Sequence, residues 1–122
     1  GLKKNYDCTF KEFKPLDVGG PLTVAALKDG TVQGADLFTT DPAIKANNFV
    51  VLDDPKNNFA AQNVVPLIRT SKASDTVKQV LNAISAKLTT AGLLDMAVKL
   101  AAPDKPNVDV VAKEWLQANG LL

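Results

Sequence analysis

GADLFTTDPAIKANNFVVLDDPKNNFAAQN, residues Gly34 to Asn63, combines two apolar runs with two polar turns. The first run ends in a turn from Thr39 to Pro42. The second run, Phe49 to Leu52, is wholly apolar, as in a strand that is covered on both faces. Between them, Asp41 is a suitable N-cap for a short helix that begins at Pro42. We therefore predict a strand, a short helix and a second strand, with ligand-contacting loops outside the strand ends, as in open α/β sheets.

The segments on either side continue this alternation to about residue 70 and then become helical. Further strands are predicted at Thr9–Leu16, Thr31–Phe38 and Val64–Arg69; the last is an edge strand or contains a bulge, because Pro66 lacks a backbone donor. Further helices are predicted to begin at Pro21, Ser74-Asp75, Thr89-Thr90 and Asp109, from their capping residues and apolar spacing. The sequence therefore predicts an α/β fold in which β/α alternation is followed by a C-terminal helical segment.

The helix that begins at Pro21 follows two glycines, and this turn has two interpretations. The first helical N–H groups can bind an anion, as helix N-termini do. Alternatively, Gly19 and Gly20 only form a tight turn into the helix. No glycine-rich nucleotide-binding motif is present.

Composition excludes several functional classes. The chain has 122 residues, enough for one domain or two small ones, and a net charge of +1 with both signs interleaved. Such a balance argues against a nucleic-acid partner. The chain has no His, which excludes Ser-His-Asp and Cys-His catalysis and the usual zinc sites, and its single Cys8 permits no intrachain disulfide. An enzyme using Asp36, Asp41 or Asp53 with a lysine would lack recognisable spacing. We predict no enzymatic activity, no catalytic residue, no metal and no cofactor.

The placed segments resemble the C-terminal half of the substrate-binding proteins of osmoprotectant (glycine betaine, carnitine, choline) ABC transporters. The matching stretches run in the family's order: Asp17–Pro21 with its helix, Asp36–Asp41, Phe49–Lys56, Phe59–Pro66, Val110–Leu116 and Gly120–Leu122. No one motif is diagnostic, but their order and spacing together are fairly specific.

This resemblance implies part of a two-lobed, type II periplasmic-binding-protein-like fold that closes on its ligand. Residues 1–60 would form part of one ligand-binding lobe. Residues 64–122 would return to the other lobe as an edge strand and the C-terminal helices. The implied function is that of the extracytoplasmic solute-binding component of an ABC importer, in the periplasm or anchored to the cell surface as a lipoprotein. Its partners would be a small solute and a membrane permease, with no nucleic acid.

The resemblance also implies a ligand site made of Phe38, Thr39, Asp41, Gln62 and Asn63. The family holds quaternary ammonium groups in a box of aromatic rings by cation–π attraction. Phe38 and Gln62 stand where two of those rings are expected, so Phe38 keeps a ring and Gln62 does not. The expected ligand is therefore either a quaternary amine or a diverged polar solute that Gln62 hydrogen-bonds.

An alternative function is a small, non-catalytic α/β interaction domain without a small ligand, in which Phe38 and Phe59 are core residues. If the chain is a fragment, the apolar strands Phe49–Leu52 and Val64–Ile68 would lack sheet neighbours. Unpaired strand edges favour pairing with another chain. We therefore expect a homo-oligomer formed by strand exchange, or a rearranged compact domain.

Overall fold

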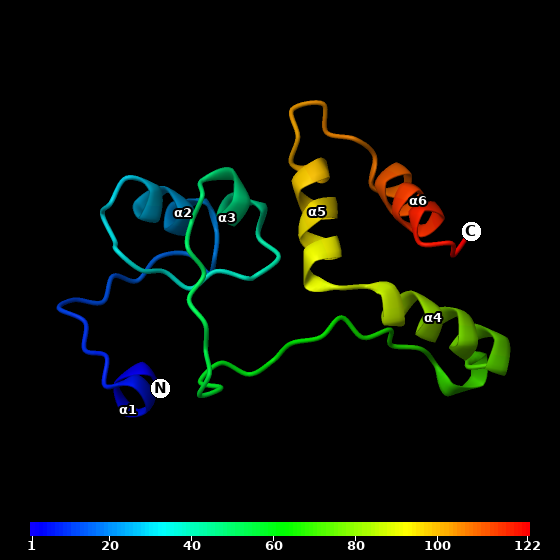
Figure 1. The fold of residues 1–122 in the computed structure, drawn as a ribbon, viewed down its shortest axis with the longest axis horizontal. Helices are drawn as coiled ribbons and strands as arrows, with labels where there is room; N and C mark the ends of the chain where they lie inside the picture. The colour runs from blue at the N-terminus through cyan, green and yellow to red at the C-terminus, as the bar shows by residue number, and fades with distance from the viewer. The chain divides into compact units, whose positions relative to one another are not determined.

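The computed structural model describes every residue from Gly1 to Leu122 (Figure 1). It contains six α-helices, one short 3-10 helix and long irregular segments, and no β-strand. The chain divides into two compact units, Gly1–Gln62 and Asn63–Leu122, which are described separately below. None of the helices has both the length and the apolar character needed to cross a membrane.

The first unit contains three short helices: α1 (Leu2–Tyr6), α2 (Pro21–Lys28) and α3 (Pro42–Ala46). The predicted starts of α2 and α3 are confirmed. The Asp41 carboxylate accepts the N–H of Ala43 at 2.8 Å, as an N-cap should. The helix ends where Asn48 turns into the left-handed region, with φ +54°, and Phe49 donates its N–H to the Ile44 carbonyl at 2.9 Å.

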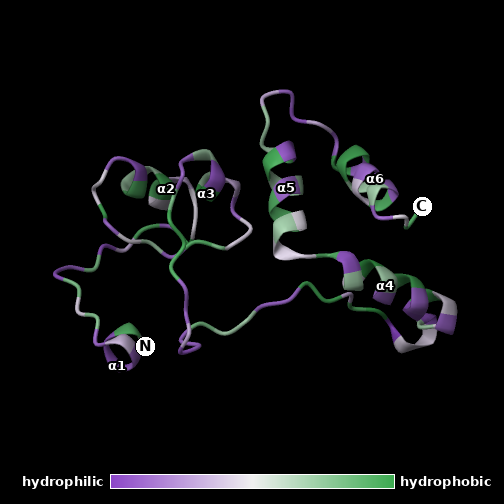
Figure 2. Ribbon diagram, in the orientation of Figure 1, coloured by the Kyte–Doolittle hydropathy of each residue, from purple (hydrophilic) through white to green (hydrophobic).

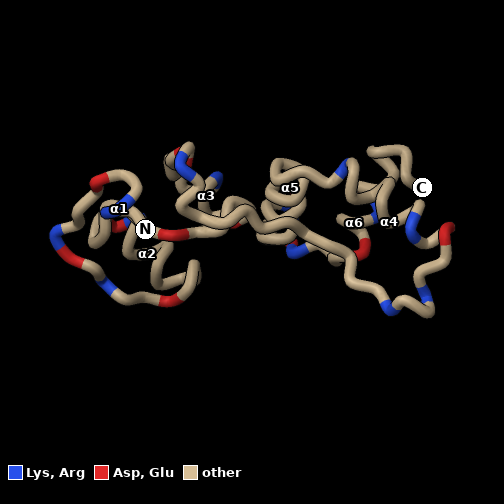
Figure 3. Tube along the Cα trace, turned by 90° about the horizontal axis from the view of Figure 1, so that it is seen from below, with Lys and Arg blue, Asp and Glu red and all other residues tan.

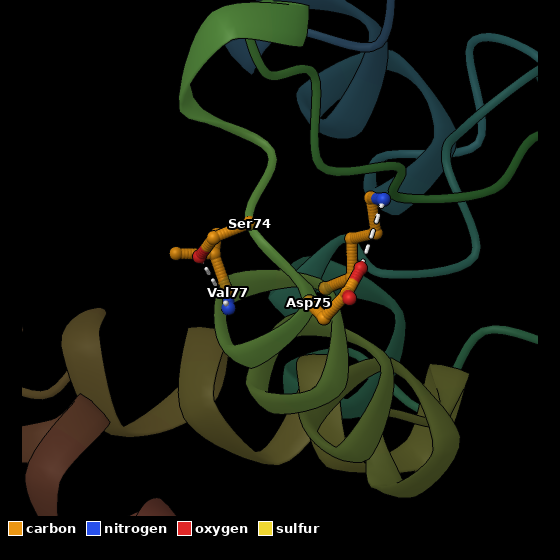
Figure 4. A network of polar contacts seen from close by, with 4 residues as sticks. Ser74, Asp75 and Val77 are labelled. Carbon is orange, nitrogen blue, oxygen red and sulfur yellow. Dashed lines mark hydrogen bonds and ion pairs between the residues drawn. The ribbon is translucent and has the colours of Figure 1, made fainter.

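The second unit contains the 3-10 helix η1 (Thr70–Lys72) and the helices α4 (Asp75–Lys87), α5 (Thr90–Leu100) and α6 (Val108–Ala118). Each α-helix begins at a polar residue whose side chain accepts a backbone N–H: Ser74, Thr89 and Asn107. At the start of α4, Ser74 Oγ accepts the N–H of Val77, and Asp75 pairs with Lys78 at 3.3 Å (Figure 4). All three C-terminal helices were predicted, and α6 begins one residue earlier than expected.

The predicted α/β fold is wrong for this structure. The four segments expected to be strands, Thr9–Leu16, Thr31–Phe38, Phe49–Leu52 and Val64–Arg69, are irregular, and no part of the chain pairs into a sheet. The apolar patterns in these segments suit an extended backbone. A β-strand also needs a neighbouring strand that completes its backbone hydrogen bonds. No such neighbour is formed, so the type II α/β architecture expected from the resemblance is absent from this structure.

Few side chains are buried. Ala26 and Thr23 in α2 and Val111 in α6 are the residues below one-tenth exposure. In the second unit, α5 and α6 pack together: a Cβ added at Gly92 would lie 3.3 Å from Trp115 Nε1. Apolar colouring also runs along irregular segments outside the helices, including the segment that precedes α4 (Figure 2). Much of the apolar surface of this chain is therefore exposed.

Candidate functional site

The Phe38 ring lines a small hollow in the first unit. Val18, Gly19, Asp36 and Leu37 complete the lining, and the volume is about 40 Å³. A water molecule occupies ~30 Å³ in the liquid, so the hollow accepts one group of about methyl size. An aromatic residue and an acidic residue therefore both belong to its lining, and these residue types suit the end of a small organic cation.

Gly19 allows the turn before α2 to approach Phe38. Its φ is +64°, in the left-handed region that favours glycine. A Cβ at this position would lie 3.7 Å from the Phe38 ring carbon Cδ2. The turn and the ring are therefore neighbours, with room for about one methyl group between them, although they are 19 residues apart in the sequence.

The N-terminus of α2 is closed by Asp17. Its carboxylate accepts the N–H of Leu22 at 3.0 Å and the N–H of Thr23 at 2.8 Å. The Thr23 hydroxyl lies 2.7 Å from the Asp17 carbonyl and 2.8 Å from Oδ1, and it can donate to one of them at a time. The N–H groups considered for an anion therefore already have an acceptor, and of the two interpretations of the turn the structure favours a tight, capped entry into the helix.

Hydrogen bonds also determine the charge state of this cap. Partial burial acts to raise the pKa of Asp17. Hydrogen bonds from Thr23, Leu22 and Gly20 outweigh burial and hold the pKa below its ordinary value. Gly20 must also be small, because a Cβ there would lie 2.3 Å from Asp17 Oδ2. Asp17 is therefore a fixed anion at the start of α2.

The predicted site residues do not all lie together. Asp41 is occupied as the N-cap of α3, and its own N–H bonds the Phe38 carbonyl at 2.8 Å, which places Thr39 in an exposed tight turn. Gln62 is exposed and is not part of the lining of the Phe38 hollow. Asn63 is exposed and belongs to the second unit. Which of these residues contact a ligand remains a prediction.

The sequence interpretation did not assign Val18, Gly19 and Asp36 to the site. Asp36 lies two residues before Phe38, and in a strand such neighbours share a face, which was an available signal. Gly19 gave a weaker signal, because a Gly-Gly pair indicates a turn without indicating what the turn contacts. Val18 gave none.

A second polar cluster joins α1 to the loop after Leu52. The Tyr6 hydroxyl donates to the Asp54 carboxylate and accepts the N–H of Lys56 at 2.9 Å. The Lys56 ammonium lies 5.1 Å from the centre of the Tyr6 ring. Asn5 adds a hydrogen bond at 2.9 Å to Asn58. These contacts fasten the N-terminal helix to residues about 50 positions later.

Charge states in this cluster follow from its hydrogen bonds. The N–H of Phe59, then the Tyr6 hydroxyl and the N–H of Asn58, lower the pKa of Asp54. Partial burial and the hydrogen bond to Asp54 raise the pKa of Tyr6. The adjacent Asp53 makes no hydrogen bond, and no group of three potential ligands is placed to hold a metal.

A larger hollow, of about 250 Å³, lies in the second unit between the end of α5, the following loop and α6. Its lining includes the ion pair of Lys99 and Glu114, whose charged atoms are 3.2 Å apart. It contains no aromatic ring, and its only ammonium group is already paired with a carboxylate. We therefore consider the smaller Phe38 hollow the better candidate for an organic cation, since size alone does not supply the recognition chemistry.

Acidic and basic residues are interspersed along the chain. Figure 3 shows basic and acidic residues scattered along both units. The chain carries 14 basic and 13 acidic residues. A neutral solute or one carrying a single charge suits such a surface better than a polyanion.

Comparison with known proteins identifies a matching family. A family model described as the substrate-binding domain of an ABC-type glycine betaine transport system matches residues 1–118. The match therefore covers almost the whole chain, including the Phe38 hollow, the Asp17 cap and the Tyr6 cluster. No solved structure matches the chain.

Proposed function

Because the chain belongs to the family of substrate-binding domains of ABC-type glycine betaine transport systems, we propose that it captures a small quaternary-amine solute outside the cytoplasm for a membrane permease. The family is non-catalytic, which supports binding and release of the solute without chemical change. The function therefore depends on affinity and specificity.

This proposal rests on one observation: Phe38 and Asp36 line the same hollow. A methylated ammonium group presents apolar methyls that carry a partial positive charge. An aromatic ring attracts such a group by ~0.5–2 kcal/mol, depending on how far the site is desolvated. The negative charge of Asp36 would also attract the positive charge of the ammonium group. One methyl group fills the hollow, and the rest of the solute extends beyond it.

Thr39, Gln62 and Asn63 are proposed to contact the polar end of the solute. Each is exposed, and each carries a hydroxyl or amide that can hydrogen-bond a carboxylate or hydroxyl group. Asp41 is proposed to act indirectly, because its carboxylate is already used to cap α3. The units on either side of Gln62 are proposed to belong to two lobes, residues 1–60 and 64–122.

We expect weak affinity from this chain alone. The hollow encloses only one end of a solute, so most of the ligand surface stays in water. A dissociation constant near ~1 mM corresponds to only about −4 kcal/mol, which one ring, one carboxylate and a few exposed hydrogen bonds can supply. NMR titration measures affinities in this range and also reports which residues are perturbed.

The test compares glycine betaine and choline with 3,3-dimethylbutanol, the uncharged isostere of choline. We expect the two cations to shift the resonances of Phe38 and its neighbours, and the isostere to bind at least several-fold more weakly. Phe38→Ala should abolish binding, Phe38→Tyr should keep it, and Asp36→Asn should weaken it. Phe13→Ala is the matched control, since Phe13 is an exposed ring outside the hollow. Equal binding of the isostere, or no effect of Phe38→Ala, would contradict the proposal.

A further inference from the structure

The larger hollow, between α5 and α6, combines apolar and charged side chains in one lining. It lies wholly within the second unit and has a volume of about 250 Å³. α6 supplies Val110, Val111 and Glu114, and Glu114 lies one turn beyond the two valines on the same face of the helix. α5 supplies Lys99 from its last turn. The packing of these two helices therefore determines most of the lining.

The loop after α5 completes the lining with Ala102, Asp104 and Pro106. The N–H of Lys105 donates to the Ala102 carbonyl at 2.9 Å, and Lys105 has a φ of +42°, so the backbone turns tightly here. The ring of Pro106 restricts the backbone further. The loop therefore holds Asp104 in the lining by its backbone.

The charged side chains of this lining carry a net charge of −1. The Lys99 ammonium lies 3.2 Å from one carboxylate oxygen of Glu114, which leaves the second oxygen available. The Asp104 carboxylate makes no hydrogen bond or ion pair within the chain. Both side chains of the Lys99–Glu114 pair are more than half exposed, so the pair itself is weak. An incoming cation therefore meets one unpaired carboxylate and one that it can share.

We propose that this hollow binds a primary alkylammonium ion with a short alkyl chain. The three N–H donors of such an ion match the carboxylate oxygens of Asp104 and Glu114. Its alkyl chain would lie against Val110 and Pro106. A quaternary ammonium group has no N–H, so the ligand chemistry differs from that proposed for the Phe38 hollow. The volume is just below the roughly 300–1,000 Å³ of pockets for drug-sized ligands, which suits an amine of about four carbons.

The test is an NMR titration of the 122-residue chain with n-butylammonium chloride. We expect a dissociation constant of about 1 mM or weaker, with the perturbed amides confined to the lining of this hollow. N,N,N-trimethylbutylammonium keeps the alkyl chain and the charge but has no N–H, and n-butanol keeps the alkyl chain without the charge. Both should bind at least about 3-fold more weakly, because charge-assisted hydrogen bonds are lost.

Two substitutions in the lining should change the affinity for n-butylammonium in opposite directions. Asp104→Asn removes the unpaired carboxylate and should weaken binding about 2- to 5-fold, as expected for one exposed charge pair. Lys99→Met removes the competing ammonium, keeps an unbranched side chain and should strengthen binding by a similar factor. Asp109→Asn is the matched control, since it removes the same charge from an α6 residue outside the lining.

This proposal is independent of solute capture at the first hollow, because Phe38 is not part of the lining. Phe38→Ala should therefore leave n-butylammonium binding unchanged. Spectra of the unliganded variants check that α5 and α6 remain packed. Equal binding of the trimethyl analogue, unchanged affinity in Asp104→Asn, weaker binding in Lys99→Met, an equal loss in Asp109→Asn, or perturbations spread over both units would each overturn the proposal.

Discussion

One carboxylate oxygen of Asp17 accepts hydrogen bonds from both the backbone and the side chain of Thr23. It lies 2.8 Å from the Thr23 backbone nitrogen and 2.8 Å from the Thr23 hydroxyl oxygen. Thr23 is 5% exposed, so this contact joins the turn at residues 17–20 to one of the few buried side chains of the first unit. The same turn places Gly19 in the lining of the Phe38 hollow. The position of the candidate solute hollow therefore depends on a helix cap.

Asp17→Asn should lower the thermal stability of the first unit. The neutral amide accepts hydrogen bonds less strongly than the carboxylate does. Because the pKa of Asp17 is lower in the folded chain than in the unfolded chain, its contribution is full above the unfolded pKa, near 4, and is lost as the pH falls through the folded pKa. Circular dichroism melts from pH 7 to below pH 4 should show a smaller acid-induced loss for the variant. Asp53→Asn is the control, and an equal change in both variants would contradict the role of the cap.

Tyr6→Phe should release α1 from the loop at residues 53–58. The change removes the donor to Asp54 and the acceptor of the Lys56 N–H, and it keeps the ring. The pKa of Tyr6 is raised in the folded chain, so the hydroxyl contributes stability below the unfolded pKa, near 10, and this contribution is lost as the pH rises through the folded pKa.

Tyr6 is the only tyrosine, so an absorbance titration of the whole chain reports this one residue. We expect its midpoint to lie above that of the unfolded chain. Limited proteolysis should cut Tyr6→Phe faster near residues 7–10 than the wild type. Equal cleavage rates would show that α1 is not held by the hydroxyl.

Ser74→Ala should destabilise α4 by about 1 kcal/mol, since it removes the side chain that accepts the Val77 N–H. Ser85→Ala is the matched control: Ser85 is an exposed serine inside the same helix, where alanine has the higher helix propensity. Helicity measured during chemical denaturation should fall for the first variant and hold or rise for the second. A larger loss of helicity for Ser85→Ala than for Ser74→Ala would exclude a capping role for Ser74.

Val111→Ala should destabilise the packing of α5 and α6 by about 1 kcal/mol more than Val108→Ala does. Both changes remove two carbons from the same helix, but Val111 is 3% exposed and Val108 is 63% exposed. Their shared gain in helix propensity cancels in the comparison. Trp115 is the only tryptophan and lies on α6, so its fluorescence reports this unit alone. Similar midpoints for the two variants would contradict the burial of Val111.

The sequence predicted five of the six α-helices, all except α1, because their signals are local. Ser74, Thr89 and Pro21 mark helix starts by their own chemistry, within a few residues of the hydrogen bonds that they make. The strands failed for the opposite reason. The apolar run at residues 49–52 says nothing about a lateral partner, and only a partner turns extended backbone into a strand.

The candidate hollow contains one residue that the sequence singled out for the ligand site, and its role in binding stays a prediction. Phe38 lines a hollow with its neighbours Asp36 and Leu37, and the other two lining residues, Val18 and Gly19, come from a turn about 19 positions earlier. That approach depends on the positive φ of Gly19, which the sequence permits without requiring. The link from Tyr6 to Asp54 spans 48 residues and had no sequence signal. Contacts between residues so far apart in the sequence depend on how the whole chain folds, and no short motif predicts them.

The boundary between Gln62 and Asn63 separates two residues whose types each occur once in the chain, Cys8 and Trp115. Cys8, the only thiol, is exposed in the first unit, and Trp115, the only indole, lies in the second. A thiol-reactive energy acceptor on Cys8 therefore forms a donor–acceptor pair with Trp115 without any mutation. The efficiency of energy transfer between them is a direct optical measure of whether a solute changes the distance from one unit to the other.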